Sequence, residues 1–200
     1  MENDNKNCND KKHEFLVEGS ELSNFLFESA EVAAQSFIFI VFILVFVFRI
    51  FTVQGSSMLS TLQNGNKVVV WQYNYQPRRG DIVVISKYGK LDESIIKRII
   101  ALPGDKLYID FATSSVYVNG KKLNEYYINE PEFGPDVNPA PIPEVVPEGY
   151  IFVMGDNRNY SSDSRSTYVG LVPIDKVVGR AFFRYFPFNK ISKLESAKYS

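Results

Sequence analysis

Two neighbouring serines, Ser56 and Ser57, stand in the segment QGSSMLSTL (Gln54–Leu62), directly after a long apolar run. A serine hydroxyl becomes an effective nucleophile only when a base takes its proton. The single histidine of the chain, His13, precedes the apolar run. If that run spans a membrane, His13 cannot reach either serine. An acyl-transfer serine here would therefore need another base, and lysine is the known substitute.

Lys97 is the candidate base because isoleucines flank it on both sides in the segment SIIKRIIAL. Burial would remove water from its ammonium group and lower its pKa from about 10.4 toward about 7–8, where the neutral amine can accept a proton. In a strand, Lys97 and Arg98 point to opposite faces, so one of them faces the more buried side. The alternative is a solvated lysine that protects an edge strand from aggregation.

A polar segment, MGDNRNYSSDSRSTYVG (Met154–Gly170), gathers hydroxyls, carboxylates and guanidinium groups in a short span. One interpretation is a polar turn with surface ion pairs, each worth about 0–1 kcal/mol. The other is a support for the base. An Asp–Arg pair would then hold the strand that carries the lysine, and a serine hydroxyl would orient its amine.

The apolar run Val32–Val53 predicts a transmembrane helix that emerges near Arg49. Its length corresponds to roughly 33 Å of helix, against a hydrocarbon core of about 30 Å. It has no polar face, which argues against a buried core helix, and no small-residue cleavage site follows it, which argues against a removable signal peptide. The polar residues before it, Met1–Glu31, predict a mostly disordered tail that turns helical near Leu22–Phe27.

The sequence after the helix alternates with period two and predicts a mainly antiparallel β domain over residues 54–190, followed by a tail over 191–200. Asn119-Gly120 predicts a tight hairpin. The proline-rich stretch Asn129–Gly149 predicts a long loop. The expected strands are 67–73, 81–86, 94–102, 106–112, 115–123, 149–156 and 177–186.

Composition removes several classes of function. The formal net charge of -1 gives no overall attraction to nucleic acid. The chain has one cysteine, Cys8, and one histidine, so we expect no disulfide, no metal site and no cofactor.

Four segments, in this order behind a membrane anchor, resemble the bacterial type I signal peptidases, the membrane-anchored Ser/Lys proteases of the leader peptidase family. The single anchor and small β domain are similar to the Gram-positive members. GSSMLSTL resembles the family's nucleophile motif, and RRGDIVVI resembles its second motif. IIKRIIALPGDKL resembles the motif that carries the lysine, and GDNRNYSSDSR resembles the last motif.

The resemblance implies Ser57 as nucleophile, Lys97 as base, Ser161 as the serine that orients the lysine, and Asp163 with Arg165 as a structural pair. It implies removal of signal peptides from translocated preproteins at Ala-x-Ala-like sites. Membrane lipid and the protein translocation machinery are then expected partners, with the tail in the cytoplasm and the β domain on the outer face of the cell membrane. The implied substrate pocket comprises Phe51, Val53, Leu62, Ile95 and Ile96.

The sequence departs from the family at two positions beside the nucleophile. Ser60 occupies a position where the family usually has proline. Gly55 stands where some members have a serine that helps to bind the oxyanion, so the backbone N–H of Ser57 is the expected main donor. Two other functions stay open: a self-cleaving repressor, which the membrane helix argues against, and a non-cleaving membrane protein that assists pilus assembly.

Overall fold

The structure is a computed structural model that describes residues 2–128, 130–131, 134 and 138–199. The chain folds into two compact units, Met1–Val45 and Phe46–Ser200. The first unit belongs to one helix, and the second contains all the strands among the described residues.

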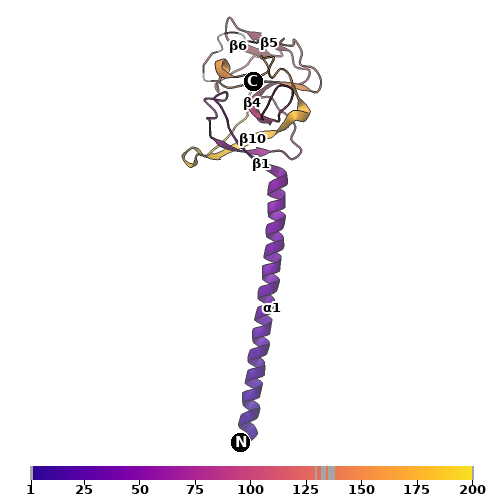
Figure 1. The fold of residues 1–200 in the computed structure, drawn as a ribbon, viewed down its shortest axis with the longest axis vertical. Coiled ribbons are helices and arrows are strands. Elements are labelled where there is room, and N and C mark those ends of the chain that lie inside the picture. Colours follow the sequence, from indigo (N-terminus) through magenta and orange to yellow (C-terminus); the bar gives the residue numbers. More distant parts are fainter. Residues whose placement is uncertain (1, 129, 132–133, 135–137, 200) are drawn as a thin grey trace. The chain divides into compact units, whose positions relative to one another are not determined.

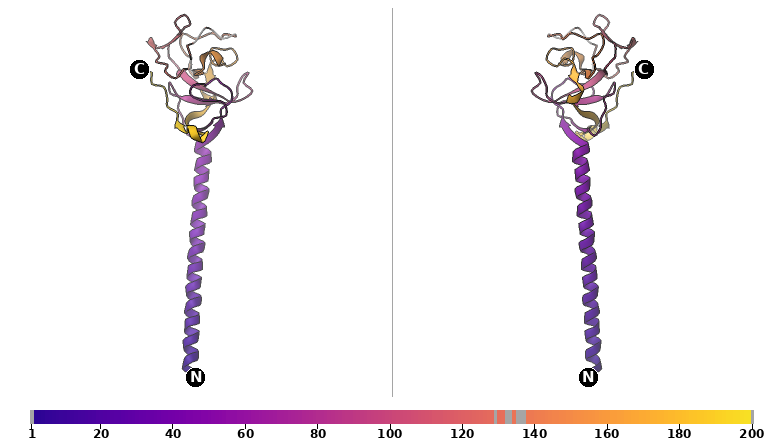
Figure 2. Two further views of the ribbon diagram at one scale, coloured as in Figure 1. Left: turned by 90° about the vertical axis from the view of Figure 1, so that its left-hand side faces the viewer. Right: turned by 90° about the vertical axis from the view of Figure 1, so that its right-hand side faces the viewer.

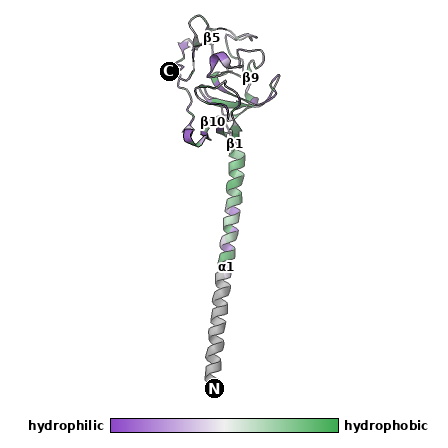
Figure 3. Cartoon of the chain, turned by 60° about the vertical axis from the view of Figure 1, so that its left-hand side comes forward, coloured by the Kyte–Doolittle hydropathy of each residue, from purple (hydrophilic) through white to green (hydrophobic). Residues whose placement is uncertain are grey.

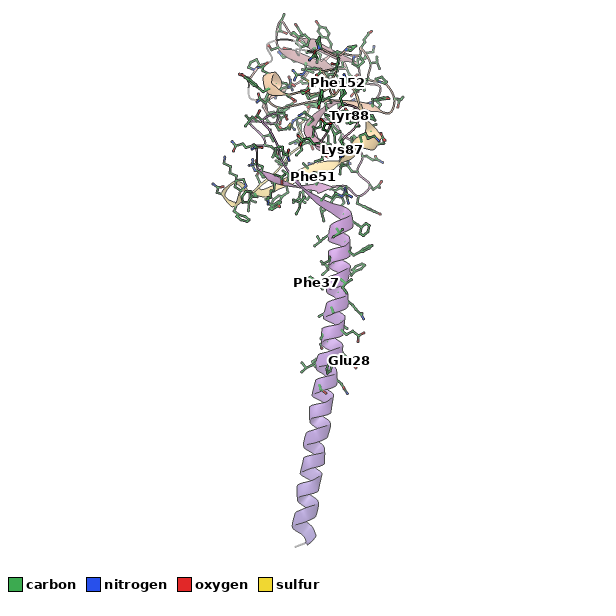
Figure 4. All side chains as sticks on the ribbon, viewed as in Figure 1. Glu28, Phe37, Phe51, Lys87, Tyr88 and Phe152 are labelled. Atoms are coloured by element: carbon green, nitrogen blue, oxygen red, sulfur yellow. The ribbon has the colours of Figure 1, made fainter. Side chains whose placement is uncertain are left out.

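Helix α1 extends over Glu2–Val47 (Figure 1). Its segment Ser23–Val47 is long and apolar enough to cross a membrane, with a mean hydropathy of 2.4, and is mostly green in Figure 3. Large apolar side chains cover its surface, and Phe37, which projects outward from the helix in Figure 4, is 67% exposed. A helix that is apolar on all sides and unburied is typical of a membrane span. The prediction of one N-terminal apolar helix is confirmed.

Both predicted boundaries of this helix, Val32 and Val53, differ from the structure. The helix ends at Val47, and Phe48–Thr52 form strand β1 instead. These five residues are largely apolar and rich in aromatic and β-branched types, which suit a strand as well as a membrane helix. At the other end, the expected disordered tail is helical from Glu2 onward. The tail contains no proline and only one glycine, so nothing in it strongly interrupts a helix.

The main sheet of the second unit is antiparallel throughout, and the fold class predicted from the sequence is confirmed. Its order is β1-β2-β10-β3-β4-β8-β9, with β11 paired to β10. The strands after β1 are β2 (Lys67–Trp71), β3 (Ile82–Ile85), β4 (Ile95–Ala101), β8 (Tyr150–Met154), β9 (Val172–Pro173), β10 (Val177–Phe186) and β11 (Ser192–Lys193).

A smaller sheet, β5-β6-β7, lies at the opposite end of the β unit from β1 (Figure 1). Its strands are β5 (Leu107–Asp110), β6 (Ser115–Val118) and β7 (Lys121–Lys122). Asn119 and Gly120 join β6 to β7 with φ angles of 52° and 78°. Asparagine and glycine tolerate this left-handed geometry best, so the predicted tight hairpin is confirmed.

The connections are mainly irregular. The described residues form three short 3-10 helices, at Arg158–Tyr160, Ile174–Lys176 and Phe188–Lys190. The described residues of the predicted loop 129–149 form no named helix or strand, and positions 129, 132–133 and 135–137 of that loop lie outside the described residues. The predicted tail 191–200 is packed rather than loose, since Leu194 and Ala197 are each only 4% exposed. The described part of this segment lies within the β unit (Figure 2).

Strand β4 is the centre of the β unit, because β3 pairs with one edge and β8 with the other. Every residue from Ile96 to Ala101 is buried. Of Lys97 and Arg98, one was expected to face the more buried side; in the structure both are buried, at 3% and 2% exposed. Packed layers cover both faces of this strand, so both charged side chains need partners inside the protein.

Candidate active site

Lys97 and Ser57 meet in the β unit, forty positions apart in the sequence. Lys97 Nζ lies 2.6 Å from Ser57 Oγ, within hydrogen-bond distance. Burial lowers the pKa of Lys97 from 10.5 to about 8; the nearby Asp163 carboxylate opposes this shift, and Arg165 adds to it. An amine with such a pKa is neutral in a useful fraction of molecules near pH 7, so it can accept the proton of the serine.

The turn that carries Ser57 is anchored by two apolar side chains. Met58 and Leu62 are 1% and 0% exposed and belong to the same hydrophobic cluster. Backbone hydrogen bonds close the turn, from Leu62 N–H to the Met58 carbonyl at 2.7 Å and from Leu59 N–H to the Ser56 carbonyl at 3.0 Å. The buried side chains of Met58 and Leu62 thus fix the turn, while Ser57 stays half-buried at the cleft.

Ser60 lies in the same turn with a φ angle of 70°, in the left-handed region. Its hydroxyl donates a hydrogen bond to the carbonyl oxygen of Tyr127. Proline cannot adopt this φ angle. The departure from the family noted at Ser60 therefore corresponds to a particular backbone conformation in this chain, held by a side-chain bond that proline could not make.

The loop after β8 contacts the nucleophile turn directly. The backbone N–H of Asn157 donates to the Ser57 carbonyl at 3.0 Å, and its side-chain amide donates to the Ser56 carbonyl at 3.1 Å. A Cβ on Gly155 would lie only 2.4 Å from the Ser57 carbonyl oxygen, so glycine is required for this close approach. Sequence reasoning did not identify Asn157, because no local pattern predicts a contact with a turn 100 residues away.

Asp156 connects the two segments that carry the reactive groups. Arg98, which follows Lys97, donates from Nε and Nη2 to the two carboxylate oxygens of Asp156, at 2.8 and 2.7 Å. The hydroxyl of Thr61, in the nucleophile turn, donates to the same carboxylate at 2.5 Å. Tyr127 covers the other side of Arg98, with its ring centroid 4.1 Å from the guanidinium carbon. The sequence placed Asp156 in a polar cluster but gave no signal for these partners.

Asp163 and Arg165 form the ion pair that the resemblance implies. Arg165 Nε donates to Asp163 Oδ1 at 2.8 Å and Nη2 to Oδ2 at 2.7 Å, and the Gly155 N–H donates to Oδ2 at 2.9 Å. Burial disfavours ionisation of Asp163, but the hydrogen bonds from Arg165 hold its pKa below the ordinary value. The pair therefore fixes the loop after β8 near Lys97, where its two members shift the lysine pKa in opposite directions.

Ser161 does not make the hydrogen bond that the resemblance implies. The resemblance implies a hydrogen bond from its hydroxyl to the lysine amine, but among the described residues Ser161 Oγ is buried and has no hydrogen-bond partner. It lies against the backbone of Gly155 instead, where a Cβ on that glycine would be 2.2 Å from it. The absence of a side chain at Gly155 leaves the space that the hydroxyl occupies.

A cleft of about 270 Å³ opens beside Ser57 and Lys97. Four of the five expected pocket residues line it, namely Phe51, Val53, Ile95 and Ile96. The fifth, Leu62, does not: it is fully buried in the core beneath the nucleophile turn. Residues that the sequence reasoning did not select also line the cleft, and these include Leu91, Glu93, Tyr160, Tyr168 and Val169.

The wall of the cleft includes a strand segment with one unpaired edge. β3 pairs with the whole of Ile95–Arg98, whereas the pairing of β8 begins only at Arg98, opposite Met154. In the part of the chain that the structure describes, no strand pairs with the other edge of Ile95–Lys97. The site can therefore accept an extended peptide by backbone pairing next to the reactive groups. Within that same part of the chain, no cluster of three or more His, Cys, Asp or Glu side chains is suited to a metal ion.

Comparison with known proteins identifies the family. The family model described as "Signal peptidase, peptidase S26" matches residues 26–186. Signal peptidase I of Bacillus licheniformis is 36% identical over 180 residues, covering 86% of this chain and 95% of that protein. Signal peptidase I of Bacillus caldolyticus is 40% identical over 159 residues, covering 74% and 84%. A crystal structure of a signal peptidase I from Enterococcus faecalis covers 52% of this chain and 96% of that one, at 32% identity and a TM-score of 0.42. With a family match over most of its length, the chain belongs to the signal peptidase family, peptidase S26.

Proposed function

We propose that this protein is a membrane-anchored serine endopeptidase that removes N-terminal signal peptides from translocated preproteins, with Ser57 as nucleophile and Lys97 as general base. One observation carries the proposal: a buried amine with a lowered pKa lies 2.6 Å from a serine hydroxyl at an apolar cleft. Membership of the signal peptidase family supports the same reaction.

The reaction begins when neutral Lys97 takes the proton of Ser57 and Oγ attacks the scissile carbonyl carbon. The tetrahedral intermediate carries a negative oxygen, which the backbone N–H of Ser57 stabilises. As the C–N bond breaks, the ammonium group of Lys97 returns the proton to the leaving amine. Lys97 then takes a proton from a water molecule as its oxygen attacks the acyl carbon. When the bond from that carbon to Ser57 Oγ breaks, Lys97 returns the proton to Oγ, and the signal peptide leaves with a new carboxylate.

The substrate lies extended along the open edge of Ile95–Lys97, and its backbone pairs with that segment. The apolar side chains of Phe51, Val53 and Ile96 leave a small cleft, which suits the short residues of an Ala-x-Ala-like site. Signal peptides are apolar and emerge at the membrane surface. The anchor Ser23–Val47 therefore keeps the cleft where its substrate becomes accessible, with the N-terminus in the cytoplasm and the β unit outside.

Cleavage of a purified preprotein by the full chain in detergent micelles tests the proposal. Ser57→Ala and Lys97→Arg should each abolish turnover, the latter because a guanidinium stays protonated at any working pH. Ser56→Ala and Lys106→Arg are matched controls at neighbouring or exposed positions, and they should retain turnover. Normal cleavage by either of the first two variants would refute the assignment. If the unmodified chain bound the preprotein but did not cleave it, the non-cleaving alternative would be supported.

A further inference from the structure

A second cavity, of about 550 Å³, lies in the β unit away from Ser57 and Lys97. Aromatic side chains form part of its wall, from Trp71 and Tyr75 and from Phe182 on β10. Three cationic side chains line it as well: Arg78, Arg180 and Lys193. None of these six residues takes part in the proposed reaction. We call this cavity the basic groove.

The charge of the basic groove is not neutralised from within. Its one carboxylate, Asp81, is buried, forms an ion pair with Arg180 at 3.3 Å, and accepts hydrogen bonds from Tyr75 and Ser196. Arg78 and Lys193 are both exposed, and no ion pair within the described residues involves either of them. Among the described residues that line the groove, three cations and one carboxylate leave a net charge of about +2, which favours an anionic ligand.

The groove lies close in the chain to the end of the apolar helix. Phe48 follows Val47 directly, so their Cα atoms are about 3.8 Å apart. The Phe48 ring packs against two walls of the groove, with centroid distances of 5.2 Å to Trp71 and 5.9 Å to Phe182. Chain connectivity and contacts inside the β unit therefore place the groove near the residue where the apolar helix ends.

Next to the end of a membrane-spanning helix, the available ligands are the headgroups of the bilayer. The hydrocarbon core is about 30 Å thick and the whole bilayer about 40–45 Å, which leaves headgroup layers of about 5–8 Å. Arginine and lysine bind phosphate groups, and tryptophan and tyrosine favour the interface between lipid and water. We infer that the basic groove binds the phosphodiester headgroup of an anionic phospholipid, with Arg78 and Lys193 as the principal contacts of its phosphate.

The chain contains its own reporter, because its only tryptophan, Trp71, lines the groove. We propose to titrate the full chain, in neutral detergent micelles at fixed ionic strength, with dihexanoyl phosphatidylglycerol, dihexanoyl phosphatidylcholine and inorganic phosphate. Trp71 emission should change saturably with phosphatidylglycerol, at a Kd at least about tenfold lower than that for phosphatidylcholine. Inorganic phosphate, which lacks the glycerol backbone and acyl chains, should bind more weakly than phosphatidylglycerol.

The double variant Arg78→Gln/Lys193→Gln should raise the Kd for phosphatidylglycerol by about tenfold or more. The matched control, Lys121→Gln/Lys122→Gln, removes the same charge from exposed β7 and should leave the Kd unchanged. The two single variants give the same test if the double variant fails to fold.

Three results would overturn the inference. Equal affinities for the two lipids would show that charge is not recognised, and equal losses in both double variants would show non-specific attraction. Equal affinity for inorganic phosphate would show an ion site rather than a lipid site. The readout requires no cleavage, so its outcome is independent of the roles proposed for Ser57 and Lys97.

Discussion

Arg98 and Asp156 form a doubly hydrogen-bonded ion pair that joins the strand carrying Lys97 to the loop that holds the nucleophile turn. Their side chains are 3% and 0% exposed, and Asp156 also accepts the hydroxyl of Thr61. A buried ion pair of this kind contributes little net stability compared with apolar residues, but removal of one partner leaves a buried charge without compensation. The pair therefore matters most as a geometric link between the two halves of the site.

Asp156→Asn should destabilise the protein by about 3–5 kcal/mol, because it leaves Arg98 buried with a neutral partner. Urea denaturation in detergent, followed by Trp71 fluorescence, measures this change. Asp175→Asn is the matched control, since its ion pair with Lys176 is exposed and should be worth at most about 1 kcal/mol. Similar losses in the two variants would show that the buried pair has no special role.

The rate of acylation should follow the ionisation of Lys97, whose pKa is lowered to about 8. Since only the neutral amine acts as a base, kcat/KM should rise about tenfold per pH unit below this pKa and reach a plateau above it. Measurement of kcat/KM for a signal-peptide substrate from pH 6 to 9.5 provides the test. A profile that is flat over this range would contradict a lysine base.

The same lowered pKa predicts a pH-dependent stability. Unfolded Lys97 binds a proton up to about pH 10.5 and the folded residue only up to about pH 8, so the unfolded state binds more protons between these values. Stability must then rise with pH across this window. Below pH 8 the buried ammonium costs on the order of 3 kcal/mol. Lys97→Met should remove this cost, so the difference in unfolding free energy between the variant and the unmodified chain should shrink from pH 8 to 10.5. A constant difference would contradict the shift.

The sequence predicted the elements whose pattern is local. Alternating β-branched and aromatic residues predicted β4 and β10 to within two residues at each end, and Asn119-Gly120 predicted its hairpin. Hydropathy alone could not separate β1 from the helix, because Phe48–Thr52 suits either structure. Only the pairing of this segment with β2, a contact over some twenty residues, distinguishes the two.

In the site, too, the residues with a local sequence motif were predicted, and the contacts between distant segments were not. Resemblance to the signal peptidase motifs selected Ser57 and Lys97, which the structure brings into contact. It could not predict the contacts of Asn157 with the nucleophile turn, because they depend on the packing of a loop 100 residues away. The resemblance assigned Leu62 to the pocket, but the turn directs its side chain into the core.

The hydroxyl of Ser161 could contribute to stability or to the orientation of Lys97 during the reaction, and two separate measurements distinguish these roles. Its buried hydroxyl has no partner among the described residues, so Ser161→Ala should leave stability unchanged or increase it by up to about 1 kcal/mol. If the hydroxyl nevertheless orients Lys97 during the reaction, kcat should fall and KM should stay constant. Paired measurements of unfolding free energy and of kcat test this. A loss of stability with unchanged kcat would show that the hydroxyl is bonded in the folded protein.

Ser60 offers a test of the nucleophile turn itself. Ser60→Pro should destabilise the protein by about 3 kcal/mol or more, because the φ angle of 70° is inaccessible to proline. It should also lower kcat/KM, since Ser57 is only three residues away. Ser60→Gly is the control: glycine accepts this angle freely, which offsets the lost hydrogen bond to Tyr127, so its stability should stay within about 1 kcal/mol. Unfolding in urea and cleavage kinetics measure both effects. A proline variant with unchanged stability and activity would show that this turn does not need the left-handed conformation.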